Sequence, residues 1–293
     1  MTLVQAEFAL PGGITLRALR TPPPPAAAPK VMFLHGFPEG AFVWEPVLQA
    51  LAGQVDAVAP WLRGYAPSSA PPQREAYRAR ALVGDLAALI ESLGGPLDLL
   101  VAHDWGGALA WNLAASAPRL LRQLMIINAP HPALLLRELR QSPAQQQASA
   151  YMDTLCRDDA LAGLRQDAWA PLLRFFGDAR WLTEAQRERY RRQWDAGLQG
   201  PLNYYAASPL RAGDRAALEA VQLPRLLTHV PVPTTVLWGL RDHALLPGLI
   251  DGLEAYVPAL RRVALPECSH WVLHEAPERV LQELRRALAL PPR

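Results

Sequence analysis

Short apolar runs alternate with longer stretches of helical periodicity along most of this chain. A run of four or five apolar residues between turn residues predicts a buried strand, and regular alternation with helices is typical of a mostly parallel sheet covered on both faces. The expected strands are residues 31–34, 55–59, 97–101, 124–127, 234–238 and 261–265. The expected helices are residues 77–93, 105–117 and 278–288.

The pattern changes between residues 131 and 225. In that stretch the apolar residues keep helical spacing, tryptophan and arginine are frequent, and no strand-like run occurs. Because strand-like runs resume at residue 234, the simplest interpretation is a helical insertion within one α/β unit. We therefore predict a core domain made of residues 1–130 and 226–293, with residues 131–225 as a helical cap inserted between two core strands.

The composition favours a folded globular protein. The chain has 293 residues, 51% of them hydrophobic, which is enough to bury a sizeable core. A net charge of +2 without a basic run gives no indication of nucleic acid binding. Cys156 and Cys268 are too few and too distant in sequence to indicate a disulfide framework or a zinc site. The chain lacks a signal-peptide pattern and an apolar run of membrane-spanning length, so we expect a cytoplasmic protein that does not bind membranes.

A candidate nucleophile lies between the strand at 97–101 and the helix that follows. Residues 102–107 read AHDWGG, which is the small-x-nucleophile-x-small pattern of a sharp strand-to-helix bend, with Asp104 in the nucleophile position. Small flanking residues are needed because larger side chains would collide at such a bend. A carboxylate, with an ordinary pKa of about 3.9, is already charged at neutral pH and can attack a saturated carbon to form an ester. The alternative interpretation is an aspartate that only caps the helix.

A base and its acid are expected near the other strand ends. In this architecture the order along the chain is nucleophile, acid, histidine. Asp242 follows the strand at 234–238 and His270 follows the strand at 261–265, so both should reach the edge of the sheet where catalytic groups collect. An Asp242–His270 pair would activate water to hydrolyse the ester. The alternatives are His274 as the base and Asp242 as a plain turn residue.

The turn after the first core strand is expected to bind a developing negative charge. Residues 35–39 read HGFPE, and such a turn can direct a backbone N–H inward. Hydrolysis of an ester on Asp104 would place negative charge on one of its oxygens. We expect the backbone N–H groups of Phe37 and Trp105 to form this oxyanion hole.

These motifs together resemble those of the epoxide hydrolases with an α/β-hydrolase fold. The resemblance spans residues 30–275 and rests on HGFPE at 35–39, HDWGG at 103–107, Asp242 after Gly239, and His270 before Trp271. It implies a mostly parallel sheet flanked by helices, an inserted helical cap, and no metal or organic cofactor. It also implies that an epoxide is opened to a diol through an ester on Asp104.

Two cap tyrosines hold and protonate the epoxide oxygen in the resembled family. By similarity these are Tyr151 and Tyr205, and a tyrosine hydroxyl suits that duty because it remains protonated at neutral pH. Tyr204 is the fallback for Tyr205. Tyr190 lies in a stretch rich in charged residues, and we expect it at the surface.

Two alternative functions stay open from the sequence. Haloalkane dehalogenases share the core motifs and would need donors for a halide, such as Trp105 together with Trp169, Trp181 or Trp194. A non-catalytic ligand receptor of the same fold is the second alternative, although the complete triad argues against it. We predict an epoxide hydrolase whose partners are a small hydrophobic epoxide and water, and we leave a homodimer open.

Overall fold

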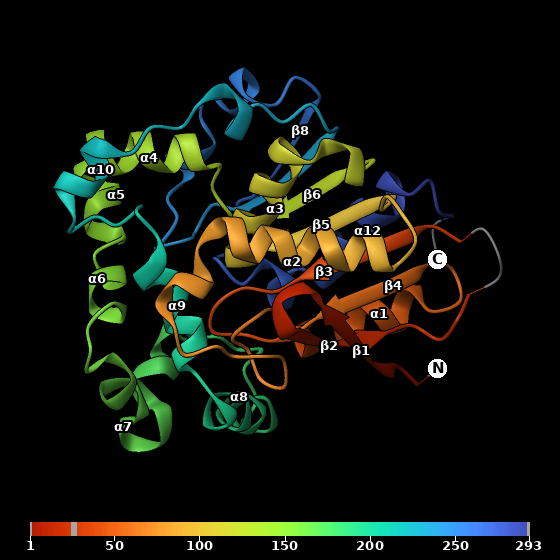
Figure 1. Ribbon diagram of the computed structural model, residues 1–293, viewed down its shortest axis with the longest axis horizontal. Helices are drawn as coiled ribbons and strands as arrows, with labels where there is room; N and C mark the ends of the chain where they lie inside the picture. Colours follow the sequence, from red (N-terminus) through yellow and green to blue (C-terminus); the bar gives the residue numbers. More distant parts are fainter. Residues whose placement is uncertain (1, 25–27, 292–293) are drawn as a thin grey trace.

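The computed structural model describes residues 2–24 and 28–291, and its centre is one eight-stranded sheet. The strand order is β1-β2-β4-β3-β5-β6-β7-β8 (Figure 1). Strands β3 to β8 run parallel, whereas β1 and β2 form a hairpin that pairs antiparallel with β4. The strands are β1 (Val4–Leu10), β2 (Ile14–Arg20), β3 (Lys30–Leu34), β4 (Asp56–Pro60), β5 (Leu99–His103), β6 (Leu124–Ile127), β7 (Thr234–Gly239) and β8 (Leu260–Leu265).

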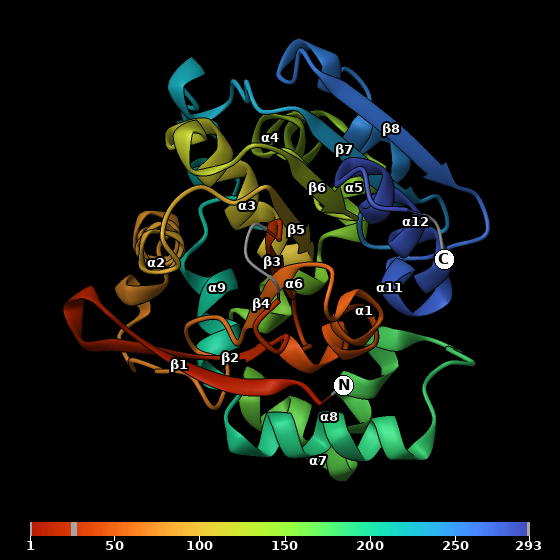
Figure 2. The same ribbon diagram turned by 90° about the vertical axis from the view of Figure 1, so that its right-hand side faces the viewer.

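Helices cover both faces of this sheet, which explains the continuous apolar runs of the central strands. Side chains alternate between the faces, so Val31 and Phe33 pack in one core cluster while Met32 and Leu34 pack in the other. Figure 2 shows α2 and α3 on one side of the sheet and α1, α11 and α12 on the other. These helices are α1 (Glu45–Leu51), α2 (Ala79–Ser92), α3 (Asp104–Ser116), α11 (Val272–Glu275) and α12 (Pro277–Ala287).

The chain between β6 and β7 forms only helices and turns in the described residues. In Figure 1 these helices gather beyond one end of the sheet. Residues from this segment and residues that follow β5, β7 and β8 line one common pocket, so the segment lies over the carboxyl ends of those strands. Its helices are α4 (Pro132–Gln141), α5 (Pro143–Ala148), α6 (Tyr151–Leu155), α7 (Ala160–Leu173), α8 (Glu184–Ala196), α9 (Gln199–Ala207) and α10 (Arg215–Ala220).

The predicted fold class is confirmed, with differences at its edges. The hairpin of β1 and β2 was not among the expected strands. The strand expected at 97–101 begins at Leu99, because Leu97 forms only an isolated bridge with Leu121. The helix expected from residue 77 is split into a short 3₁₀ helix, Arg74–Tyr77, and α2. Among the described helices, none combines the length and the apolar character needed to cross a membrane.

Candidate active site

Asp104 occupies a strained bend between β5 and α3. Its φ of 49° lies in the left-handed region, which a side chain with a Cβ rarely adopts. Three glycines leave room for the bend. A Cβ at Gly36 would lie 2.3 Å from the Cβ of Asp104, and one at Gly106 would lie 2.6 Å from the carbonyl oxygen of His35. At Gly107 it would lie 2.2 Å from the Cβ of Ala129. Packing around the bend therefore fixes where the Asp104 carboxylate points.

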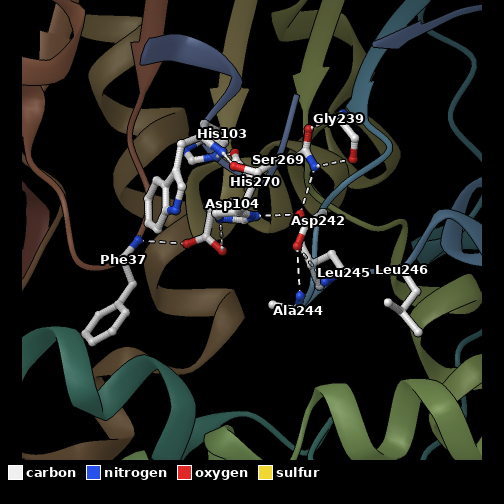
Figure 3. Close-up of polar contacts among 12 residues, drawn as sticks. Phe37, His103, Asp104, Gly239, Asp242, Ala244, Leu245, Leu246, Ser269 and His270 are labelled. Carbon is white, nitrogen blue, oxygen red and sulfur yellow. Dashed lines mark hydrogen bonds and ion pairs between the residues drawn. The ribbon is translucent and has the colours of Figure 1, made fainter. Parts of the chain in front are cut away.

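One predicted oxyanion donor already contacts this carboxylate. The backbone N–H of Phe37 donates to Oδ1 of Asp104 at 2.7 Å (Figure 3). The N–H of Trp105, the second predicted donor, makes no hydrogen bond with the Asp104 side chain in the described part of the chain. A single backbone donor therefore holds Oδ1, and Oδ2 is left facing His270.

The structure brings Asp104, Asp242 and His270 together, as Figure 3 shows. Nδ1 of His270 lies 2.7 Å from Oδ2 of Asp242, and Nε2 lies 3.6 Å from Oδ2 of Asp104. The imidazole thus stands between the two carboxylates with one ring nitrogen turned to each. The contact between His270 and Asp242 is a strong charge-assisted hydrogen bond, whereas the longer contact between His270 and Asp104 is an ion pair.

Asp242 receives three further hydrogen bonds. The backbone N–H groups of Ala244 and Leu245 each donate to Oδ1 at 2.9 Å. The side chain of Asn128 donates from Nδ2 to Oδ2 at 2.8 Å, and its Oδ1 accepts from the N–H of Gly239 at 2.8 Å. No role was expected for Asn128 from the sequence. A polar residue directly after a buried strand was the available signal for this contact.

These contacts set the ionisation of the pair. Burial disfavours the imidazolium, but the charge and hydrogen bond of Asp242, with a smaller contribution from Asp104, raise the pKa of His270 to about 9. Burial alone would also raise the pKa of Asp242, but the His270 cation holds it below its usual range. Both shifts describe the same ion pair, in which His270 carries a proton at neutral pH.

Both predicted cap tyrosines face this group across a cavity of about 450 Å³. Tyr151, at the start of α6, and Tyr205, in α9, line the cavity together with Asp104 and His270. The rings of Tyr151 and Tyr205 are 6.2 Å apart between centroids. Burial, followed by the nearby Asp104 charge, raises the pKa of the Tyr151 hydroxyl. Burial likewise raises the pKa of Tyr205, so both hydroxyls keep their protons.

The other tyrosines named from the sequence lie elsewhere. The hydroxyl of Tyr204 donates to the backbone oxygen of Arg63 at 2.8 Å and is not among the cavity-lining groups. The expectation of a surface position for Tyr190 was wrong, because its side chain is only 1% exposed. Its hydroxyl donates to Oε1 of Glu39 at 2.7 Å. The aromatic face of an otherwise charged helix turns inward there.

Glu39 is the centre of a buried polar cluster behind the site. Its oxygens lie 2.7 Å from Nε2 of His274 and 3.3 Å from Nδ1 of His103. Burial alone would raise the pKa of Glu39, but the two imidazoles hold it well below its usual range. His274, the alternative base, contacts Glu39 and stacks on Trp181, with ring centroids 3.9 Å apart. Its ring is held by these two groups and not by Asp104.

Similarity to known proteins identifies the family. A sequence profile described as alpha/beta hydrolase fold matches residues 29–277. The chain belongs to the α/β-hydrolase-fold family. It is 32% identical to the AB hydrolase superfamily protein YfhM of Bacillus subtilis, over 95% of this chain and 96% of that protein.

Named epoxide hydrolases are also among its relatives. The chain is 30% identical to epoxide hydrolase 4 of Mus musculus, over 85% of this chain and 70% of that protein. It resembles, at 28% identity and a TM-score of 0.89, an epoxide hydrolase from Bacillus megaterium that was solved with its product (R)-3-[1]naphthyloxy-propane-1,2-diol. That match covers 97% of this chain and 100% of the other. The chain is thus an epoxide hydrolase-like α/β hydrolase.

Proposed function

We propose that the protein opens hydrophobic epoxides to vicinal diols through an ester on Asp104. The observation that carries this proposal is the opposition, across one cavity, of a carboxylate at a strained bend and two protonated tyrosines. A nucleophile on one side and proton donors on the other are what a strained three-membered ether requires. The helical segment 131–225 supplies both tyrosines, and we propose that it acts as a cap that closes over the substrate.

The first step forms the ester. An oxygen of Asp104 attacks one epoxide carbon and forms a C–O bond, while the bond from that carbon to the ring oxygen breaks. The electron pair of the broken bond stays on the ring oxygen, which takes a proton from Tyr151 or Tyr205. An alkoxide is a poor leaving group without that proton, which gives both hydroxyls their role.

The second step frees the diol. His270 takes a proton from water, and the resulting hydroxide attacks the carbonyl carbon of the Asp104 ester. The N–H of Phe37 stabilises the oxyanion of the tetrahedral intermediate, with the N–H of Trp105 as the proposed second donor. The intermediate collapses by breaking the bond to the alcohol oxygen. That oxygen takes up the proton of the new carboxyl group and leaves as the diol, which restores the carboxylate.

Ester formation favours the neutral form of His270 that can act as a base. In the free protein the pKa of His270 is about 9, so the imidazole is protonated and cannot accept a proton from water. Once Asp104 is esterified, its negative charge no longer stabilises the imidazolium, and burial continues to oppose that cation. The pKa of His270 therefore falls, which favours transfer of its proton to the tyrosinate left by the first step and formation of the neutral imidazole needed for the second.

The tryptophans give little support to the dehalogenase alternative. The indole of Trp169 donates to Asp195 at 2.9 Å, and that of Trp194 donates to the backbone oxygen of Pro38 at 2.6 Å. Trp181 stacks on His274. None of these three indoles is among the groups that line the cavity, where a departing halide would need them.

The proposal is tested by trapping the ester. His270→Gln removes the base, so incubation with styrene oxide or phenyl glycidyl ether should leave the peptide that contains Asp104 heavier by the mass of one intact epoxide. Mass spectrometry of the digested protein detects this adduct. The double variant Asp104→Asn/His270→Gln is the matched control and should carry none.

Two further results would redirect the assignment. An adduct formed from a 1-haloalkane, with the mass of the alkyl group alone, would support the dehalogenase alternative. Tyr205→Phe and Tyr151→Phe should each slow ester formation from epoxides by about 10- to 1,000-fold, because each removes a proton donor. Unchanged epoxide turnover in both variants would contradict the role given to the tyrosines.

A further inference from the structure

A buried glutamine links the cap segment to the loop that carries the acid. Gln145, in α5, is 1% exposed. Its Nε2 donates to Oγ of Ser149 and to the backbone oxygen of Ala244, both at 2.8 Å, and its Oε1 accepts from the N–H of Leu246 at 3.0 Å. A backbone oxygen needs a donor and a backbone N–H needs an acceptor, so only one orientation of the amide satisfies both.

One end of this link lies next to Asp242. Ala244 and Leu246, which Gln145 holds, flank Leu245 in the turn after β7. The N–H groups of Ala244 and Leu245 are the two backbone donors to Oδ1 of Asp242 (Figure 3). The amide of Gln145 therefore fixes the turn whose N–H groups hold the acid against His270.

The other end lies next to Tyr151. Ser149, the second partner of the Gln145 amide, is 1% exposed. Its backbone oxygen accepts from the N–H of Met152 at 3.0 Å, which forms the first turn of α6. Tyr151 begins that helix, so the position of its hydroxyl over the cavity depends on where Ser149 is held.

We propose that Gln145 is a positioning residue that sets the Asp242–His270 pair and Tyr151 relative to one another. For the part that concerns Tyr151 this rests on the proposed function, whereas the part that concerns Asp242 and His270 does not. Gln145 itself touches neither carboxylate. It acts because its one buried amide connects two parts of the site. One is the helical segment that carries Tyr151, and the other is the turn that orients Asp242 against His270.

The variant that tests this is Gln145→Met, which keeps an unbranched side chain of similar length without the amide. It leaves the backbone oxygen of Ala244 and the N–H of Leu246 without their partners, and the turn around Asp242 should loosen. The readout is an NMR titration of ¹⁵N-labelled histidine, which follows His270 in the free protein without any substrate. Gln146→Met is the matched control, since Gln146 donates to the backbone oxygen of Leu139 in α4 and not to the acid loop.

The expected direction follows from the groups that face His270. Asp242 and Asp104 favour its cation, the more distant Glu39 does so too, and burial opposes it. His103 packs against the ring at 4.7 Å between centroids. When the turn loosens, the contact with Asp242 weakens while burial remains, so Gln145→Met should lower the pKa of His270 by about one unit. Gln146→Met should leave it unchanged.

Single-turnover kinetics give the second readout. Both half-reactions should slow by about tenfold per active site in Gln145→Met. The wild-type amide positions Tyr151 for the first half-reaction and the Asp242–His270 pair for the second. A residue that served folding alone would reduce the fraction of active protein and leave the rate per active site unchanged. An unshifted His270 pKa together with wild-type rates per site would overturn the proposal.

Failure of the two proposals can be told apart. If the wild-type protein formed no ester with any epoxide but Gln145→Met still lowered the His270 pKa, the proposed function would fail and the positioning of the pair would stand. If Gln145→Met did not fold, Gln145→Asn would replace it. That variant keeps a neutral amide on a side chain one methylene shorter, which cannot reach the backbone groups of both Ala244 and Leu246, so the same downward shift is expected.

Discussion

Asn128 donates a hydrogen bond to the same oxygen of Asp242 that contacts His270. Its Nδ2 lies 2.8 Å from Oδ2 of Asp242, and Nδ1 of His270 lies 2.7 Å from that atom. Because Oδ1 is held by two backbone N–H groups, both lone pairs of each carboxylate oxygen are engaged. The acid is therefore fixed in position from the ends of β6 and β7 at once.

Loss of the Asn128 side chain should destabilise the protein. Asn128→Gly removes two short buried hydrogen bonds and a longer one to the backbone oxygen of Gly239, and we expect the free energy of unfolding to fall by about 2 kcal/mol. Asn128 has a φ of 38°, so Asn128→Ala should cost about 1 kcal/mol more than the glycine variant. Urea unfolding measures both values. Asn112→Ala, which loses a local bond within α3, should change stability by less than about 0.5 kcal/mol, and an equal loss in all three variants would contradict the assignment.

The free energy of unfolding should fall between pH 6.5 and pH 9. His270 binds its proton more tightly in the folded protein, where its pKa is about 9, than at its ordinary value of 6.5. Its contribution is therefore fully present below pH 6.5 and is lost as the pH rises through 9, with a total of about 3 kcal/mol. Urea unfolding at intervals across this range tests it. His270→Gln should show a flatter profile, and parallel profiles for the two proteins would refute the shift.

A methyl group at position 36 should slow ester formation. In Gly36→Ala the new Cβ would lie 2.3 Å from the Cβ of Asp104 and 2.4 Å from its Oδ1, so the carboxylate must move. A displacement of about 1 Å should reduce the rate of ester formation about 100-fold. Gly84→Ala is the control, because its Cβ meets nothing within 4 Å in α2. That variant should keep its activity and gain up to about 1 kcal/mol of stability.

The charge of a substrate should affect its turnover. The cavity lining contains Asp104, Asp178, Asp242 and Glu275, and it includes neither lysine nor arginine. A phenyl glycidyl ether with a para-carboxylate should therefore show kcat/KM about tenfold below the neutral parent at low salt, and the gap should narrow as salt is added. Asp178→Asn should reduce the gap, whereas Glu7→Gln, on the distant hairpin strand β1, should not. Equal values for charged and neutral substrates would count against this prediction.

The parallel core could be predicted because each of its strands is buried on both faces. Strand β6 matches its expected bounds, 124–127. Its apolar run is bounded by the polar residues Gln123 and Asn128, which mark both ends. The hairpin of β1 and β2 escaped prediction because its residues alternate in polarity and only one side is buried. The Pro-Gly-Gly turn at Pro11–Gly13 indicates a hairpin, but a search for apolar runs does not detect it.

At the candidate site, the residues proposed to carry the chemistry were easier to find from the sequence than the residues that hold them in position. Asp104, Asp242 and His270 each follow a strand, so the topology alone brings them to one edge. Asn128 and Gln145 could not be assigned in the same way. Their contacts join segments about 100 residues apart, and amide side chains carry no chemical signature of the reaction. Burial of Tyr190 was missed because its neighbours in sequence are charged.

The raised pKa of His270 has a consequence for the stoichiometry of protons during turnover. The resting imidazolium carries one more proton than the neutral form that hydrolysis of the proposed ester requires. In the proposed mechanism, protonation of the ring oxygen leaves a tyrosinate. His270 can give its proton to that tyrosinate in the first half of the cycle and take a proton from water in the second. In a weakly buffered solution below pH 9, a burst of turnover should then leave the pH of the medium unchanged throughout. The protein would then exchange no net proton with the solvent during a turnover.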